Sequence, residues 1–161
     1  MASQLKLGAP VTEHQMAAAR LVAKTVVGRT TWTNKANTAW VEARWPIRHE
    51  MASVDLKLVA TVNTRAPEKH SASMLWNEVR VAGVCVLTPH VNKHTDQNSF
   101  GWEVHEHVWT DECNATWCRA VARPAGSVRD AVEQLCDSFN VKFVVDWTDP
   151  PLAYQIGMVK L

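Results

Sequence analysis

The chain has 161 residues, of which 47% are hydrophobic and 20% are charged. These values are typical of a globular domain, and they exclude a largely disordered chain, a collagen-like rod and a coiled-coil rod. Seventeen basic residues against sixteen acidic ones give a formal net charge of +1, so the chain lacks the strongly basic footprint of a dedicated nucleic-acid-binding protein. The unusual features of the composition are 8 Trp and 7 His beside only 6 Gly.

At this length we expect a single domain, residues 1–161, whose core needs no disulfide to hold it together. The longest stretch without a charged residue, 81–92, is much shorter than the about 20 apolar residues that span a bilayer. The first predicted helix is too charged for a secretory signal. The four cysteines contain no C-x-x-C pair, and we expect reduced thiols in a soluble, cytoplasmic protein rather than two disulfides.

Charge is unevenly distributed along the chain. Residues 1–50 hold seven Lys and Arg against three Asp and Glu, whereas residues 103–149 hold four against nine. Opposed patches of this kind favour a homo-oligomer or a charged partner, although a plain solvated surface accounts for them equally well.

Two helices are predicted from their capping signals. Thr12 opens a capping box, and the apolar positions that follow predict a helix over residues 12–27, with Gly28 as the left-handed residue that ends it. Ser127 is placed to cap a second amphipathic helix over residues 127–139.

The remaining elements are predicted strands, over residues 41–47, 54–63, 73–86, 102–109, 117–122, 142–147 and 152–161. Pro46 marks an edge or the end of the first strand, because proline cannot donate to a ladder, and Gly83 is a candidate bulge in the third. Short polar turns between most strands favour an antiparallel meander. The chain is therefore expected to be α+β, with a mainly antiparallel sheet of about five to seven strands and both helices packed on one face.

Four of the seven histidines lie within eighteen residues: His90, His94, His105 and His107. Alternation divides the strand over residues 102–109 into two faces. The more apolar face, which we assign to the core, holds Trp102, Val104, Glu106 and Val108. The other face, which we expect to meet solvent or a cleft, holds Glu103, His105, His107 and Trp109.

Two imidazoles at this spacing can bind one metal ion, or they can act as acid and base, because an imidazole titrates near neutral pH. The metal ligands that we expect are His90, His94, His105 and His107, the first two contributed by the polar loop before the strand. Zinc, manganese or iron would suit such a set: three ligands and an open position are typical of catalytic zinc, whereas two histidines and a carboxylate are typical of non-haem iron.

The catalytic residues that we expect are His105, His107, Glu103 and Glu112, with a carboxylate orienting an imidazole or acting as base. The same residues also fit a plain structural interpretation, in which half-exposed sheet histidines are hydrogen-bonded to Glu103 or Glu112.

The spacing of His105, His107 and Glu112 resembles the first metal motif of the cupin family, and residues 124–126 resemble part of the second motif. The glycines expected around the first motif are absent, and Arg129 stands where the second motif has its metal-binding histidine. A helix is predicted where a cupin continues in strands. We therefore do not assign the chain to that family.

Two functions follow from these patterns. The first is a small enzyme that carries out hydrolysis or elimination on a nucleotide or another phosphoester, since the chain has no fingerprint of a redox cofactor. The alternative is a non-catalytic interaction or inhibitor module, of the kind that viruses often encode, which would bind a protein partner through a Trp-rich sheet face.

Overall fold

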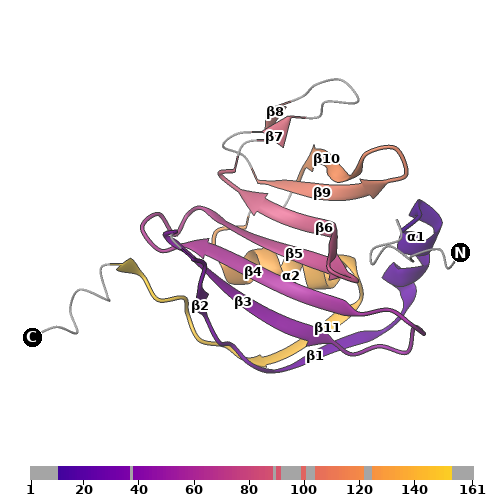
Figure 1. The fold of residues 1–161 in the computed structure, drawn as a ribbon, viewed down its shortest axis with the longest axis horizontal. Coiled ribbons are helices and arrows are strands. Elements are labelled where there is room, and N and C mark those ends of the chain that lie inside the picture. Colours follow the sequence, from indigo (N-terminus) through magenta and orange to yellow (C-terminus); the bar gives the residue numbers. More distant parts are fainter. Residues whose placement is uncertain are drawn as a thin grey trace, which may run out of the picture.

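The computed structural model describes residues 11–36, 38–88, 90–91, 99–100, 104–121 and 125–153, with only the backbone of residues 90–91 and 99–100. Figure 1 shows two helices and a large sheet that twists across the molecule. The expected α+β class is confirmed. Neither helix in the described part of the chain is long and apolar enough to cross a membrane.

The main sheet has seven strands in the spatial order β10-β9-β6-β5-β4-β3-β2, and every neighbouring pair is antiparallel. The strands are β2 (Thr33–Asn34), β3 (Trp40–Ile47), β4 (Leu56–Asn63), β5 (His70–Trp76), β6 (Val79–Val86), β9 (His105–Thr110) and β10 (Asn114–Ala120). A small antiparallel pair, β7 (His90–Val91) and β8 (Ser99–Phe100), lies next to β10.

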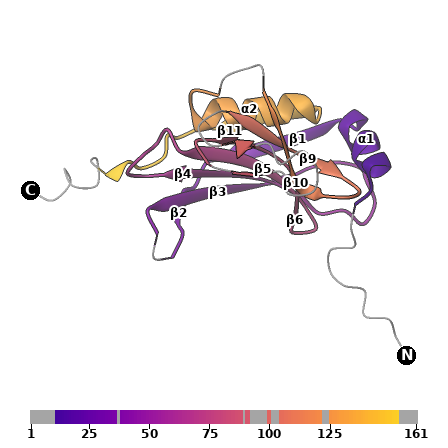
Figure 2. The same cartoon turned by 90° about the horizontal axis from the view of Figure 1, so that it is seen from above.

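Helix α2 (Val128–Ser138) lies along one face of the main sheet, against β4, β5 and β6 (Figure 2). Its Ser127 cap is as predicted, and Asp130 completes a capping box. The core between helix and sheet contains Val132 and Leu135 from α2 and Leu58, Ala60 and Ala72 from the sheet. Helix α1 (Glu13–Leu21) lies at the end of the sheet near β9, where Glu13 and Asp111 exchange hydrogen bonds with each other's backbone amides.

The prediction that the first helix continues to residue 27 is wrong. The capping box at Thr12 is confirmed, but α1 ends at Leu21, and Lys24–Arg29 form strand β1. This strand pairs in parallel with β11 (Val141–Asp146), outside the main sheet. The run Thr25, Val26, Val27 favours a strand because its side chains are branched at Cβ, and the partner strand lies more than a hundred residues away in sequence.

The predicted strand over residues 73–86 is a hairpin instead. Its two strands, β5 and β6, are joined at Asn77 and Glu78, which both have positive φ (48° and 68°). Two successive left-handed residues are the geometry of a type I′ hairpin turn, in which asparagine is common but glutamate is not. The bulge lies between Met74 and Leu75 of β5, so the prediction of a bulge at Gly83 is also wrong.

The two ends of the sheet agree with the sequence in part. Pro46 pairs with Lys57 of β4 on one side of β3. On the other side β2 pairs only with Val41 and Glu42, so Pro46 has no partner strand there to which it would have to donate a hydrogen bond. The strand predicted over 142–147 is β11. The strand predicted over 152–161 lies outside the described residues from 154 onward.

Candidate functional site

The face of β9 that carries the histidines is buried, which reverses the orientation predicted from the sequence. The exposed fractions of His105, His107 and Trp109 are 0%, 2% and 5%, whereas Glu106 and Val108 are only half-buried. Hydropathy misassigned the faces because no residue of β9 is exposed, so polarity did not distinguish the buried face from the half-buried one. Glu106 is accommodated by an ion pair with Arg119 of β10.

Strand register places two cysteines on the same face as the histidines. Cys85 of β6 lies directly opposite His105, and Cys118 of β10 lies directly opposite His107. Directly opposed residues project to the same side of a sheet, and their Cβ atoms lie about 5 Å apart. Three neighbouring strands thus present two thiols and two imidazoles to one buried region.

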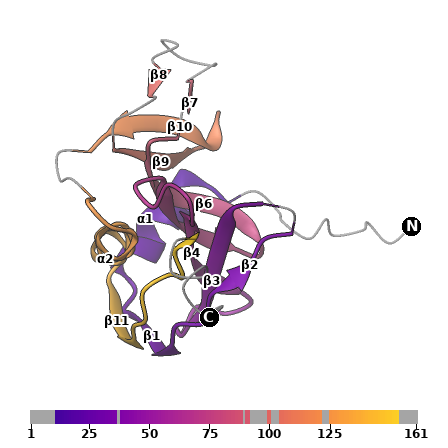
Figure 3. The same cartoon turned by 90° about the vertical axis from the view of Figure 1, so that its left-hand side faces the viewer.

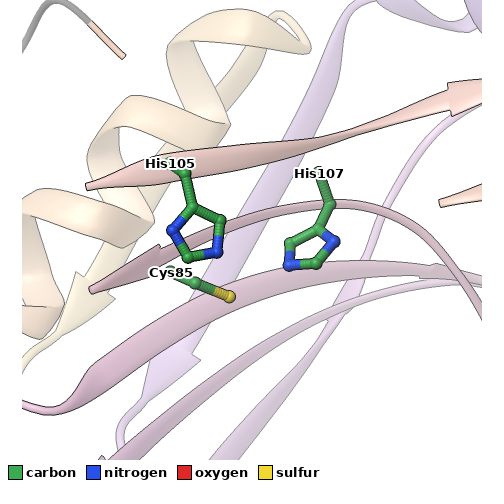
Figure 4. A group of neighbouring side chains, drawn as sticks. All are labelled: Cys85, His105 and His107. Carbon is green, nitrogen blue, oxygen red and sulfur yellow. The ribbon is translucent and has the colours of Figure 1, made fainter. Parts of the chain in front are cut away.

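Cys85, His105 and His107 approach one another closely enough to bind one metal ion. The Sγ atom of Cys85 and one ring nitrogen from each histidine all lie within 4.8 Å of one another. Figure 4 shows the three side chains pointing toward one another, with the Cys85 sulfur beside the ring of His105. Around a tetrahedral zinc ion, one sulfur and two nitrogen ligands are about 3.3–3.5 Å apart, given Zn–S and Zn–N bonds of about 2.3 and 2.0 Å. Shifts of about an ångström would therefore complete the geometry.

A backbone contact orients the ring of His107. Its Nδ1 lies 2.9 Å from the carbonyl oxygen of Ala115, so an Nδ1–H donates there and Nε2 keeps its lone pair. Histidine ligands of metals commonly donate their second ring N–H to a carbonyl or a carboxylate, which fixes both tautomer and ring orientation. The Cys118 sulfur lies 3.5 Å from Nδ1 and 3.9 Å from Nε2 of the same ring.

Gly83 makes room for this imidazole. It lies opposite His107 in the β6–β9 ladder. A Cβ atom at position 83 would lie 3.1 Å from the carbonyl oxygen of Ala72, 3.3 Å from Oγ of Ser73 and 3.7 Å from Cδ2 of His107. The first two distances are tighter than ordinary contacts, so any side chain here would crowd β5 beside the histidine.

Burial keeps the thiols protonated at neutral pH. Desolvation raises the pKa of Cys85 to about 11, although Arg80 and a hydrogen bond from Ser71 act in the opposite direction. Burial likewise raises the pKa of Cys118 to about 11, again opposed by Arg80. The thiolate is the reactive form of cysteine, so Cys85 is a poor nucleophile by itself. A bound metal ion would favour the thiolate by direct coordination.

The structure brings together only part of the predicted site. His105 and His107 do converge. Glu112 lies in the exposed turn after β9, away from the Cys85 group. His94 and Glu103 lie outside the described residues, as does the side chain of His90 at the start of β7, so their roles stay predictions.

Cys85 is the residue of this candidate site that the sequence analysis does not identify. Its distance from His105 along the chain hides their pairing, which only the β6–β9 register reveals. A further buried histidine, His70, is 1% exposed, and its two ring nitrogens lie 3.0 and 3.1 Å from the carbonyl oxygens of Pro67 and Ala125. It links the start of β5 to the segment before α2. His14, by contrast, is exposed.

No protein-family model matches the chain, and no match was found among curated proteins or solved structures. The function therefore has to be argued from the geometry of this molecule.

Proposed function

We propose that the protein is a metal-binding domain whose ion, zinc, is held by Cys85, His105 and His107. The observation that carries the proposal is the convergence of three buried donor atoms within 4.8 Å. Two of the residues come from one strand and the third lies directly opposite one of them, so the ligand set is built into the sheet.

The chemistry of the donors favours zinc over the other metals considered. A thiolate and two imidazoles are soft or borderline ligands, which zinc prefers, whereas manganese prefers oxygen ligands. The non-haem iron arrangement requires a carboxylate. Within the described residues, no carboxylate oxygen belongs to the group of ligand atoms that lie within 4.8 Å of one another.

The fourth coordination position decides between a structural and a catalytic ion. Structural zinc has four protein ligands, whereas catalytic zinc keeps one position for water or substrate. The Cys118 sulfur is near His107, but it does not belong to the group in which every ligand atom lies within 4.8 Å of the others. Among the residues that the structure describes we therefore favour three ligands, and an ion with an open position supports hydrolysis or elimination on a phosphoester as the activity. The four free cysteines agree with a reducing, cytoplasmic setting.

The interaction-module alternative receives less support. It required tryptophans exposed on a sheet face. Of the seven tryptophans that the structure describes, Trp45 and Trp109 are buried and the other five are half-buried. Trp32, Trp45 and Trp147 also contact one another or Phe143 ring to ring, so these rings form a packed cluster rather than an open binding surface.

Metal analysis of the purified protein tests the zinc proposal. We expect about one zinc ion per chain, and its loss in a His105→Ala, His107→Ala double variant. His14→Ala, which removes an exposed histidine outside the group, is the matched control and should keep the metal. Because both ligands are buried, a circular dichroism spectrum must first show that the double variant folds. If it does not fold, Cys85→Ser replaces it. A wild-type protein that neither contains zinc nor takes it up would refute the proposal.

A further inference from the structure

A pocket of about 330 Å³ opens beside Cys85 and is lined by Lys35, Trp40, Thr61, Ser71, Arg80 and Cys85, among others. Thr61 and Ser71 lie opposite each other on β4 and β5, and they alternate with the buried core residues Val62 and Ala72. The pocket is therefore on the sheet face turned away from α2. Figure 3 shows α2 on one side of the sheet, and the pocket lies on the opposite face.

Hydrogen-bond donors line this pocket. The hydroxyl oxygens of Thr61 and Ser71 are 2.7 Å apart, so one of the two donates to the other. Each hydroxyl proton can rotate to donate to a bound ligand instead. The Ser71 hydroxyl is also close enough to Cys85 to favour its thiolate, which places the pocket wall beside the proposed metal ligand. The half-buried indole of Trp40 supplies an apolar wall.

The charge of the pocket is positive. Lys35 is partly neutralised by Glu42, 3.5 Å away, and Glu42 also pairs with Arg44. Arg80 has no acidic partner within the described ranges, and it is close enough to Cys85 and Cys118 to favour both thiolates. A guanidinium without a counter-ion, beside hydroxyl donors, is a typical arrangement for binding the oxygens of a phosphoryl group.

We propose that this pocket binds the phosphoryl group of a small substrate, with Arg80 as its anchor and the hydroxyls of Thr61 and Ser71 as further donors. The organic part of the substrate lies along Trp40. This inference rests on the proposed zinc function, since it places the substrate beside the Cys85 side of that metal centre. It narrows the substrate class to phosphate esters, which the zinc site alone does not specify.

The test uses cobalt-substituted protein, with inorganic phosphate as probe and acetate as the comparison anion. Isothermal titration calorimetry should show phosphate binding to the wild type, and the d–d absorption of cobalt should change on addition. Arg80→Gln should weaken phosphate binding about tenfold or more while the cobalt content stays unchanged. Arg65→Gln removes an exposed arginine outside the pocket lining and should bind phosphate like the wild type.

The outcomes separate the two proposals. A protein that binds cobalt but not phosphate, or whose Arg80→Gln variant binds phosphate normally, would overturn the pocket and leave the zinc site intact. Acetate binding as strong as phosphate binding would overturn the phosphoryl specificity. Phosphate binding that depends on Arg80 in a protein that takes up no metal would support the pocket and overturn the zinc site.

Discussion

At the scale of single residues, the candidate site depends on which side chains share a strand face. Alternation correctly predicted that His105, His107 and Trp109 would lie together, because the period of a strand is fixed by its backbone. Combined with hydropathy it predicted the wrong face to be buried, because no residue of β9 is exposed and polarity does not separate the two faces. Cys85 belongs to the site because β6 pairs with β9 and places it opposite His105. The pattern of residues within one strand does not predict which strand lies beside it.

Thiol reactivity tests the protonation state assigned to the cysteines. Burial raises the pKa of Cys85 and Cys118 to about 11 and that of Cys136 to about 12. A raised pKa leaves the thiol protonated until the pH approaches that value, so in metal-free native protein at pH 7.5 these three cysteines should react very slowly with Ellman's reagent. All four cysteines should react at once in denaturant. Rapid labelling of Cys85 in the native state would argue instead for an activated nucleophile.

Gly83→Ala tests whether the imidazole of His107 requires a residue without a side chain at position 83. The added Cβ would crowd Ala72 and Ser73 of β5, and we expect a loss of about 1–3 kcal/mol in the free energy of unfolding, measured by urea denaturation. Zinc affinity should fall as well, because the ring of His107 lies over this position. Gly126→Ala is the control, since a Cβ there meets nothing closer than 3.6 Å. Equal stability of the two variants would contradict this interpretation.

At the scale of elements, local signals predicted where most helices and strands begin, but not where α1 ends. The capping boxes at Thr12 and Ser127 are short-range hydrogen bonds within four residues, so the sequence carries them directly. The early end of α1 depends on distant partners: β1 pairs with β11, and the buried ammonium of Lys24 donates to the carbonyl oxygens of Ala19, Val22 and Phe139. Lys24 thereby caps the C-terminal ends of both helices.

Lys24→Met tests this cap. The variant would leave three carbonyl oxygens without their donor in a region where Lys24 is 3% exposed, and we expect a loss of about 2 kcal/mol or more in the free energy of unfolding. Burial lowers the pKa of Lys24 to about 8, whereas an unfolded lysine keeps its proton up to about pH 10.4. Between these values the unfolded state binds more protons at Lys24, so this residue should contribute a rise in stability with pH, opposed by the fall that the three buried thiols contribute. That rise should be absent in Lys24→Met; an unchanged pH profile would contradict the assignment.

At the scale of the whole molecule, the order of elements was sufficient to predict an α+β domain, because runs of strands joined by short turns pair with their neighbours. The parallel β1–β11 pair was not predictable in this way. β1 contacts β3 and β11 contacts α2, so two segments from opposite ends of the chain close the core together. The proposed zinc centre lies near the other end of the main sheet, at β6 and β9, where the ion would join two neighbouring strands.

Removal of the metal should therefore lower the stability of the domain. A ligand that binds only the folded state stabilises it by mass action, by about 4 kcal/mol at a thousandfold excess over Kd. For a chain of this size we expect a fall in Tm of about 5 °C or more when zinc is chelated, recovered on adding zinc back. The His14→Ala protein should behave like the wild type. A Tm that is insensitive to chelator would mean that the ion, if bound, does not link these strands.

The most direct test of the zinc centre is X-ray absorption at the zinc edge on the purified protein. With Cys85, His105 and His107 as ligands, the first shell should contain one sulfur at about 2.3 Å and two imidazole nitrogens at about 2.0 Å, with one further light atom at the open position. In Cys85→Ser the sulfur contribution should disappear. A first shell with two sulfurs would make Cys118 a fourth ligand and contradict the open position, and a shell of light atoms alone would contradict the centre itself.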